Sequence, residues 1–168
     1  MPKKSNQPVK PIENRTYLNE NSTEYLNKSS REYSIYTLSR AIVGIDGLKS
    51  AQRKAIFAIS KVQGKIKTMS LGGKMIEMEI YVHGDSSANS TISMLASPVV
   101  NNYPLIEGRG SFGTMTNPEP AAPRYTYVKK SKSTEALVLN DYDIVPMQDN
   151  YDGSTKEPTY FLPIIPLS

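Results

Sequence analysis

Two places in the sequence have residue types suited to nucleophilic or acid–base chemistry: the pair Arg124-Tyr125 and the histidine His83. Tyr125 directly follows Arg124. The ordinary pKa of a phenol is about 10, so at neutral pH it becomes a nucleophile only with a proton acceptor or a cation beside it. His83 is the only histidine, and its ordinary pKa of about 6.5 lets it take up or release a proton. Each also has a simpler interpretation: a strand tyrosine packed beside a solvated arginine, and a histidine that caps or packs at a helix start.

Composition argues against several other kinds of site. The chain has no cysteine, which excludes disulfides, thiolate nucleophiles and cysteine-ligated zinc. A single histidine excludes a histidine-rich metal site, although not a carboxylate site. The glycines between Gly108 and Gly113 nearly follow a dinucleotide-binding spacing, but the segment before them is short and contains Pro104, and no helix with a ribose-binding acid follows. A structural turn is therefore favoured over a phosphate loop.

Positive charge is concentrated in two segments. The chain has 20 Lys and Arg against 16 Asp and Glu, a net charge of +4. No acid lies among the basic residues between Gly47 and Lys74, and a second basic group lies between Arg124 and Lys132, whereas the C-terminal stretch is acidic. Such one-sign segments favour DNA or RNA over a membrane as partner. The sequence has no run of about 18 apolar residues and no apolar signal core, so we expect a soluble, cytoplasmic protein.

The elements that must position these residues begin with two predicted helices. Residues 1–22 are polar and lack periodic apolar positions, which predicts a flexible arm. Apolar residues recur with helical spacing over 24–41 and again over 50–63. The second helix has Ser50 as a possible cap and Gly64 as its stop.

The next elements are shorter. Leu71-Gly72-Gly73 indicates a turn, and residues 74–82 fit a short helix or an extended piece. A helix is predicted from the His83–Ser87 stretch to Pro98, with Asp85 or Ser86 as its cap. The Gly108–Gly113 stretch can form a tight loop, and residues 125–128 have strong strand propensity.

Three short helices followed by glycine-rich turns suggest a helix-turn-helix with a wing. We therefore expect an α+β fold: a helix-rich winged-helix domain over residues 23–139 with a small β wing. Residues 140–168, with their Asp, Pro and Tyr and a final apolar run, are expected to form a separate linker-like segment that docks on a partner or continues into a longer protein.

An ordered set of short motifs carries a family resemblance. In sequence order they are Asp46-Gly47-Leu48-Lys49, Gln52-Arg53-Lys54, His83-Gly84-Asp85-Ser86, Gly110-Ser111-Phe112-Gly113, Arg124-Tyr125-Thr126 and Asp149-Asn150-Tyr151-Asp152-Gly153. Together they resemble the breakage-reunion subunit of type II DNA topoisomerases, the group that contains gyrase A. The resemblance is closest to the medium subunit of T-even-like phage topoisomerases and covers roughly residues 31–168. It implies that residues 140–168 are the incomplete start of the family's tower or linker region.

The resemblance implies roles for particular residues on a CAP-like winged-helix domain. Tyr125 would form a 5′-phosphotyrosyl link to each cut strand, and Arg124 would contact the scissile phosphate. His83 would accept the phenolic proton or donate to a phosphate oxygen. Arg40, at a family position near the DNA backbone, would be the fourth catalytic residue. Further residues would lie near the DNA backbone or along the bound duplex: Lys49, Gln52, Arg53, Lys54 and Ser86. Fluoroquinolones in relatives bind through a water–metal bridge to a serine and a nearby acid, at positions that match Ser86 and Ser90.

The resemblance also implies partners and cofactors. Double-stranded DNA would be the substrate, Mg²⁺ would be held by the acids of a partner's Toprim module, and ATP would be used by that ATPase/Toprim protein. The full-length enzyme would be a homodimer in the cytoplasm, the host's cytoplasm if a phage encodes it.

The chain departs from the family pattern at three places. Residues 41–45 run one residue short and lack a proline, Tyr81-Val82 replaces His-Pro, and Ser168 falls before the tower region, as in a truncated chain. Two rival interpretations remain: a winged-helix DNA-binding module in which Tyr125 only packs the wing, and a catalytically inactive remnant.

Overall fold

A computed structural model of the chain describes residues 21–167. The chain divides into a first unit that ends at Tyr36 and a second that begins at Thr37. The arm predicted for 1–22 lies outside the described residues except for its last two, and Ser22 already begins helix α1 (Ser22–Ala41). The predicted first helix is thus confirmed. Asn21 precedes it, and its side-chain oxygen accepts a hydrogen bond from the amide of Thr23 at 3.0 Å.

The second unit is built around helices α2 (Ser50–Ser60), α3 (Thr68–Glu77) and α4 (Asp85–Ala96). Their apolar residues meet in one core, in which Ile56, Leu71 and Ile92 are completely buried. The prediction of α2 ran too far, to residue 63. Its last amides turn back to carbonyls only three residues earlier, Lys61 to Ala58 and Val62 to Ile59, so the chain tightens and leaves the helix before Gly64.

The turn predicted at Leu71-Gly72-Gly73 is wrong, because these residues lie inside α3. Glycine usually weakens a helix interior. At Gly72 the missing side chain makes room for α4, since a Cβ there would collide with the carboxamide of Asn89. Of the predicted 74–82 stretch, the first four residues complete α3 and the rest form a turn and loop.

The predicted helix caps are also wrong. Lys49 is the cap residue of α2, and the side chain of Gln52 accepts the Lys49 amide at 2.8 Å. Gly84 caps α4 with φ of 83°, and no side chain of residues 21–167 caps that end with a hydrogen bond. Ser50 and Asp85 are already the first helical residues of their helices, whereas a capping side chain must stand one position earlier.

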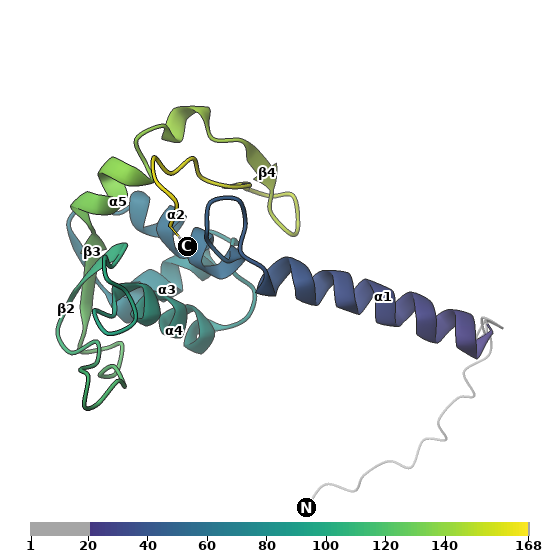
Figure 1. The fold of residues 1–168 in the computed structure, drawn as a ribbon, viewed down its shortest axis with the longest axis horizontal. Coiled ribbons are helices and arrows are strands. Elements are labelled where there is room, and N and C mark those ends of the chain that lie inside the picture. The colour runs from purple at the N-terminus through teal and green to yellow at the C-terminus, as the bar shows by residue number, and fades with distance from the viewer. Residues whose placement is uncertain (1–20, 168) are drawn as a thin grey trace, which may run out of the picture. The chain divides into compact units, whose positions relative to one another are not determined.

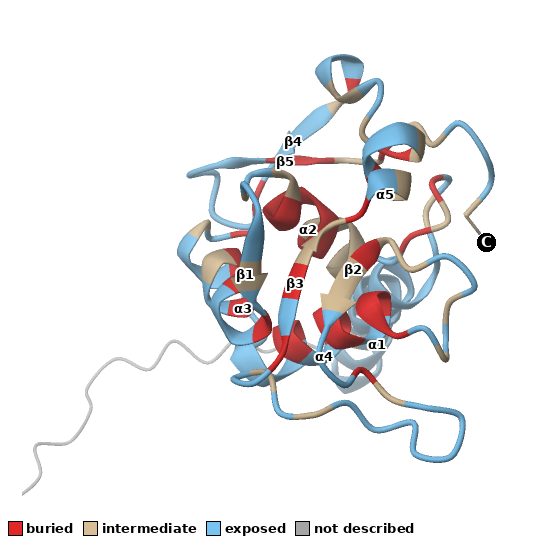
Figure 2. Ribbon diagram, turned by 90° about the vertical axis from the view of Figure 1, so that its left-hand side faces the viewer, coloured by how far each residue is buried: buried red, intermediate tan, exposed pale blue. Residues whose placement is uncertain are grey.

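A three-stranded antiparallel sheet lies beside the helices. Strand β3 (Tyr127–Lys130) is central, between β1 (Lys65–Lys67) and β2 (Ile106–Arg109). Val128 of β3 is opposite both Ile66 and Gly108, and it is completely buried. Figure 2 shows the buried residues gathered where α2, α3 and α4 face this sheet. The stretch predicted as a tight loop therefore begins as the end of β2 and turns only after it.

The C-terminal part packs against the same unit. It contains α5 (Lys132–Leu137), a 3-10 turn η1 (Tyr142–Ile144) and a hairpin of β4 (Met147–Asp149) with β5 (Lys156–Pro158). Phe161 is buried in the core, and its amide donates to Asp46 Oδ2 at 3.1 Å. β5 packs against α2, and the amide of Ile164 donates to the carbonyl of Leu137 at the end of α5 at 2.9 Å; Figure 1 draws this last part of the chain in yellow. The assignment of 140–168 to the start of a tower remains a prediction.

The α+β class is confirmed, since helices and small antiparallel sheets occur together. Within residues 21–167, no helix combines the length and the apolar character needed to cross a membrane.

Candidate functional site

Tyr125 ends a turn that Thr126 separates from β3, and its side chain lies in solvent. Its amide donates to the carbonyl of Ala122 at 2.9 Å, which closes the turn. The next residue anchors the turn to α3: Thr126 is buried, its hydroxyl shares a 2.7 Å hydrogen bond with that of Thr68, and its carbonyl accepts the Thr68 amide at 3.0 Å. The Tyr125 side chain is 71% exposed. The interpretation of Tyr125 as a packed strand residue is therefore wrong, and its phenol is accessible to a large substrate.

Arg124 places a cation at the same turn. Its guanidinium carbon lies 5.9 Å from the centroid of the Tyr125 ring, within reach of a cation–π contact. A planar guanidinium beside an exposed phenol is suited to binding a phosphate, because it can donate two parallel hydrogen bonds to its oxygens.

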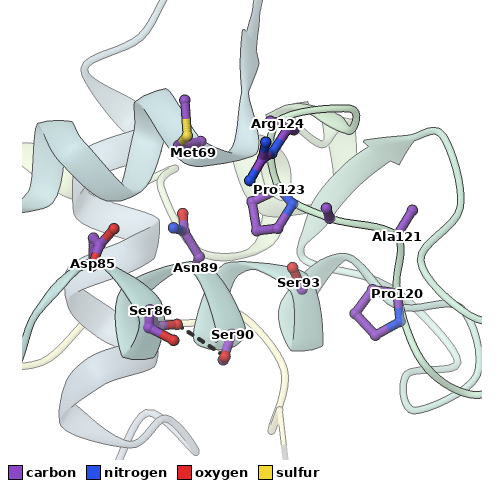
Figure 3. Close-up of a pocket in the computed structure, with 11 residues that line it drawn as sticks. Met69, Asp85, Ser86, Asn89, Ser90, Ser93, Pro120, Ala121, Pro123 and Arg124 are labelled. Carbon is purple, nitrogen blue, oxygen red and sulfur yellow. Dashed lines mark hydrogen bonds between the residues drawn. The ribbon is translucent and has the colours of Figure 1, made fainter.

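A cavity of about 360 Å³ opens between Arg124 and helix α4. One wall is the segment of residues 120–124, and α4 supplies a polar face in which Ser86, Asn89, Ser90 and Ser93 recur at helical spacing. Figure 3 shows Asn89 pointing from α4 toward Met69 of α3, while the Ser90 hydroxyl turns back to the carbonyl of Ser86 at 2.9 Å. The structure thus brings Ser86, Ser90 and Arg124 to one cavity.

Asn89 is a residue of this cavity that sequence reasoning missed. It is buried, and among residues 21–167 its Oδ1 has no hydrogen-bond partner. The signal that could have revealed it is the spacing of Asn89 relative to Ser86 and Ser90, which puts all three on one helical face.

His83 stands just before α4, on a loop that begins after α3. The His83 and Tyr81 rings pack in an edge-to-face arrangement, with their centroids 5.6 Å apart. Partial burial lowers the pKa of His83, and the positive charges of Arg40 and Lys54 lower it further. Both effects favour the neutral form of His83, which is the form that can accept a proton. Because the charges of Arg40 and Lys54 act on His83, both residues lie near it.

Within residues 21–167, no hydrogen bond, ion pair or ring contact joins His83 to Tyr125 or Arg124. The predicted catalytic residues therefore form two groups, Tyr125 with Arg124 and His83 with Arg40.

Arg53 of α2 has a structural partner. Its Nε and Nη2 donate to the two carboxylate oxygens of Asp46 at 2.7 and 2.9 Å, and Nη2 also reaches the carbonyl of Leu48 at 3.1 Å. Burial raises the pKa of Asp46, but the hydrogen bonds from Arg53 and from the amides of Phe161 and Leu48 outweigh it and hold the pKa below its ordinary value. Asp46 is thus a buried carboxylate that ties α2 to the C-terminal segment.

The other predicted DNA-contact residues at α2 differ in whether their side chains already bind a partner within the fold. Lys54 Nζ lies 3.0 Å from Glu157 Oε2, and Glu157 is buried. Gln52 uses its side-chain oxygen to cap its own helix, whereas Lys49 is exposed. Contacts of these residues and of Arg53 with DNA remain predictions.

The described residues contain no group of three or more His, Asp or Glu side chains suited to hold a metal ion. The expectation that a partner holds Mg²⁺ remains a prediction.

Comparison with known proteins places this arrangement in a family. The family model of gyrase A and its topoisomerase IV counterpart matches residues 40–168. The chain is 36% identical over 86% of its length to a DNA topoisomerase 2 of Arabidopsis thaliana, 33% identical over 75% to the gyrase A protein of Thermotoga maritima, and 33% identical over 88% to a DNA topoisomerase 2 of Invertebrate iridescent virus 6. These matches span 10%, 17% and 13% of the three relatives' own lengths. The chain belongs to the gyrase A/topoisomerase IV family of DNA topoisomerases.

Proposed function

We propose that this chain supplies the DNA-cleaving tyrosine of an ATP-dependent type II DNA topoisomerase. The observation that carries the proposal is the exposed phenol of Tyr125 beside Arg124, and Arg124 lines a cavity whose α4 wall is polar. Family membership supports it, since the relatives are DNA topoisomerases by name.

In the proposed reaction, the phenolic oxygen of Tyr125 attacks a DNA phosphorus atom. The bond from phosphorus to the 3′ oxygen of the neighbouring nucleotide breaks, and a 5′-phosphotyrosyl ester forms. Because the ester preserves the energy of the broken bond, the 3′ hydroxyl can later reverse the step and religate the strand. Double-strand passage requires two such tyrosines, hence a homodimer.

The chain's own residues have distinct proposed roles. Arg124 donates to the phosphate oxygens, which carry extra negative charge in the transition state. His83, whose neutral form is favoured by its lowered pKa, accepts the phenolic proton directly or through water, with Arg40 beside it near the DNA backbone. Lys49 and Ser86 bind the duplex, and Gln52, Arg53 and Lys54 support the surface on which it lies.

Other components come from a partner in this proposal. A Mg²⁺ ion held by the acids of a Toprim module would stabilise charge on the leaving 3′ oxygen. The same partner would bind and hydrolyse ATP. We also assign α2, α3 and α4 with the sheet β1-β3-β2 to a CAP-like winged-helix domain, with β2 and β3 as its wing.

The alternative is a DNA-binding module or remnant without chemistry. A tyrosine that only packed the wing would be buried, so the exposure of Tyr125 favours the catalytic role.

The test is covalent capture of DNA by the assembled enzyme after denaturation with detergent. We expect Tyr125→Phe to abolish the protein–DNA adduct and to leave duplex binding within about twofold, because only a hydroxyl is removed. Tyr103→Phe is the matched control, since Tyr103 is equally accessible at 80% exposed. Adducts that persist in Tyr125→Phe would show that another residue is the nucleophile.

A further inference from the structure

The loop that carries His83 begins at a strained residue. Glu79 has φ of 57°, the only positive value at a non-glycine position in residues 21–167. Side chains other than glycine rarely adopt this conformation, because the Cβ crowds the backbone, and it persists only where surrounding contacts hold it. His83 follows four residues later, so the backbone direction set at Glu79 determines where the loop leads.

The β4–β5 turn supplies those contacts. Asn150 is buried, and its Nδ2 donates to the carbonyl of Glu79 at 3.1 Å and to the hydroxyl of Ser154 at 3.1 Å. Ser154 in turn donates to the Glu79 carboxylate, and Thr155 donates to the carbonyl of Met78 at 3.3 Å. Three side chains of one turn thus bind two consecutive residues at the end of α3.

The orientation of Asn150 is itself fixed. Its Oδ1 accepts a hydrogen bond from the backbone amide of Asp152 at 3.3 Å, and the backbone amide of Asn150 donates to the carbonyl of Thr155 at 2.9 Å. Both ends of the carboxamide are therefore used, so the donor that reaches Glu79 cannot turn away without losing a partner.

A second anchor lies at the far end of the loop. Tyr81 is buried, its hydroxyl shares a 2.7 Å hydrogen bond with that of Ser87 on α4, and its ring packs against His83. The loop is held at its start by the hairpin turn and near its end by Tyr81, with His83 just beyond.

We propose that Asn150 is a positioning residue, which sets the place of His83 in the site by holding Glu79 in its left-handed backbone conformation. The proposal rests on the proposed function, in which His83 serves the cleavage reaction. It gives the Asp149-Asn150-Tyr151-Asp152-Gly153 motif a role that acts through the backbone of Glu79.

The first measurement is the titration of His83 by NMR in the chain as it stands. Because the chain has one histidine, its imidazole signals are unambiguous. The charged groups that act on His83 are Arg40 and Lys54, and Tyr81 packs on its ring. In Asn150→Ala we expect the ring to leave these surroundings, so that its pKa rises toward the ordinary value of about 6.5.

The second measurement is the rate of covalent capture in the assembled enzyme. We expect Asn150→Ala to lower it by about 10- to 100-fold, the range expected for a misplaced acid–base group, with DNA affinity changed by less than about twofold. Asn140→Ala is the matched control, because in the described part of the chain the Asn140 side chain bonds only to the neighbouring Asp141.

Rescue separates positioning from a general loss of stability. Glycine adopts positive φ without strain, so Glu79→Gly added to Asn150→Ala should restore both the His83 titration and the capture rate. If Asn150→Ala does not fold, Asn150→Asp keeps the size and the acceptor, and it replaces the amide donor with a charged oxygen that cannot donate to Glu79, so the same changes are expected. An unchanged His83 titration in a folded Asn150 variant, or failure of Glu79→Gly to rescue, would overturn the proposal. Absence of any adduct in the unmodified enzyme would instead refute the proposed function, and the titration would still decide the positioning role.

Discussion

Replacing Arg53 with alanine should lower the free energy of unfolding of this chain, and this loss should exceed any loss in the free energy of DNA binding. Asp46 is 1% exposed, and the Arg53 side chain is 13% exposed. The substitution removes two charge-assisted hydrogen bonds and leaves a buried carboxylate without its cation, a change that costs about 3–5 kcal/mol in buried ion pairs. The amides of Leu48 and Phe161 still donate to Asp46 at 3.1 Å each. We therefore expect the lower end of the range, about 3 kcal/mol.

Urea denaturation followed by circular dichroism measures this loss. With a urea dependence of about 2 kcal/mol per molar, typical of small domains, the midpoint should fall by about 1.5 M. Lys49→Ala is the control: Lys49 is also a predicted DNA contact but is exposed, so its midpoint should stay within the equivalent of about 0.5 kcal/mol.

The pH dependence of stability provides a second check on the same pair. The folded pKa of Asp46 lies below its ordinary value. Its contribution to stability is therefore present above the unfolded pKa, about 3.9, and is lost as the pH falls through the folded pKa. Asp46→Asn should weaken this acid dependence. A loss below about 1 kcal/mol in Arg53→Ala, together with a large loss of DNA affinity, would refute the structural role and assign Arg53 to DNA.

Three further predictions follow from the charge and the geometry of the site. DNA affinity should fall steeply with salt and depend little on sequence, and replacing the exposed Lys65 and Lys67 by alanine should reduce the slope of log K against log salt by up to about 2; an unchanged slope would remove these lysines from the DNA surface. Ser90 lies in the cavity with Ser86, where it cannot supply the charged anchor of a drug's water–metal bridge, so Ser90→Glu should increase drug-stabilised cleavage, and a variant no more sensitive than its parent would count against this. The 168-residue chain alone, given Mg²⁺ and supercoiled DNA, should bind DNA without cleaving it, because no partner holds the Mg²⁺ against the leaving 3′ oxygen. The loss of even one well-placed electrostatic group costs about 10²–10³ in rate. Covalent adducts formed by the chain alone would contradict the proposal that the partner supplies the metal.

Much of the local structure could be predicted from the sequence, because it depends on residues close together in the chain. Apolar spacing predicted α1, α2 and α4, since a helix is stabilised by contacts three and four residues apart. The acid-free segment between Gly47 and Lys74 is visible in the sequence alone. The order of short motifs pointed to the family that the comparisons then showed.

Tertiary structure determined the features that join distant segments. Gly72 lies inside a helix because Asn89 needs the space, and nothing near Gly72 in the sequence reveals that neighbour. Arg53 resembled a DNA contact, but in the folded chain it pairs with Asp46, which also accepts the amide of Phe161, 115 positions further along. The exposure of Tyr125 depends on the pairing of Thr126 with Thr68, and the shape of the His83 loop depends on Asn150, 71 positions after Glu79. Burial and long-range hydrogen bonds form only when distant segments pack together. The spacing of residues along one sequence reports on near neighbours in the chain, so it does not reveal these contacts.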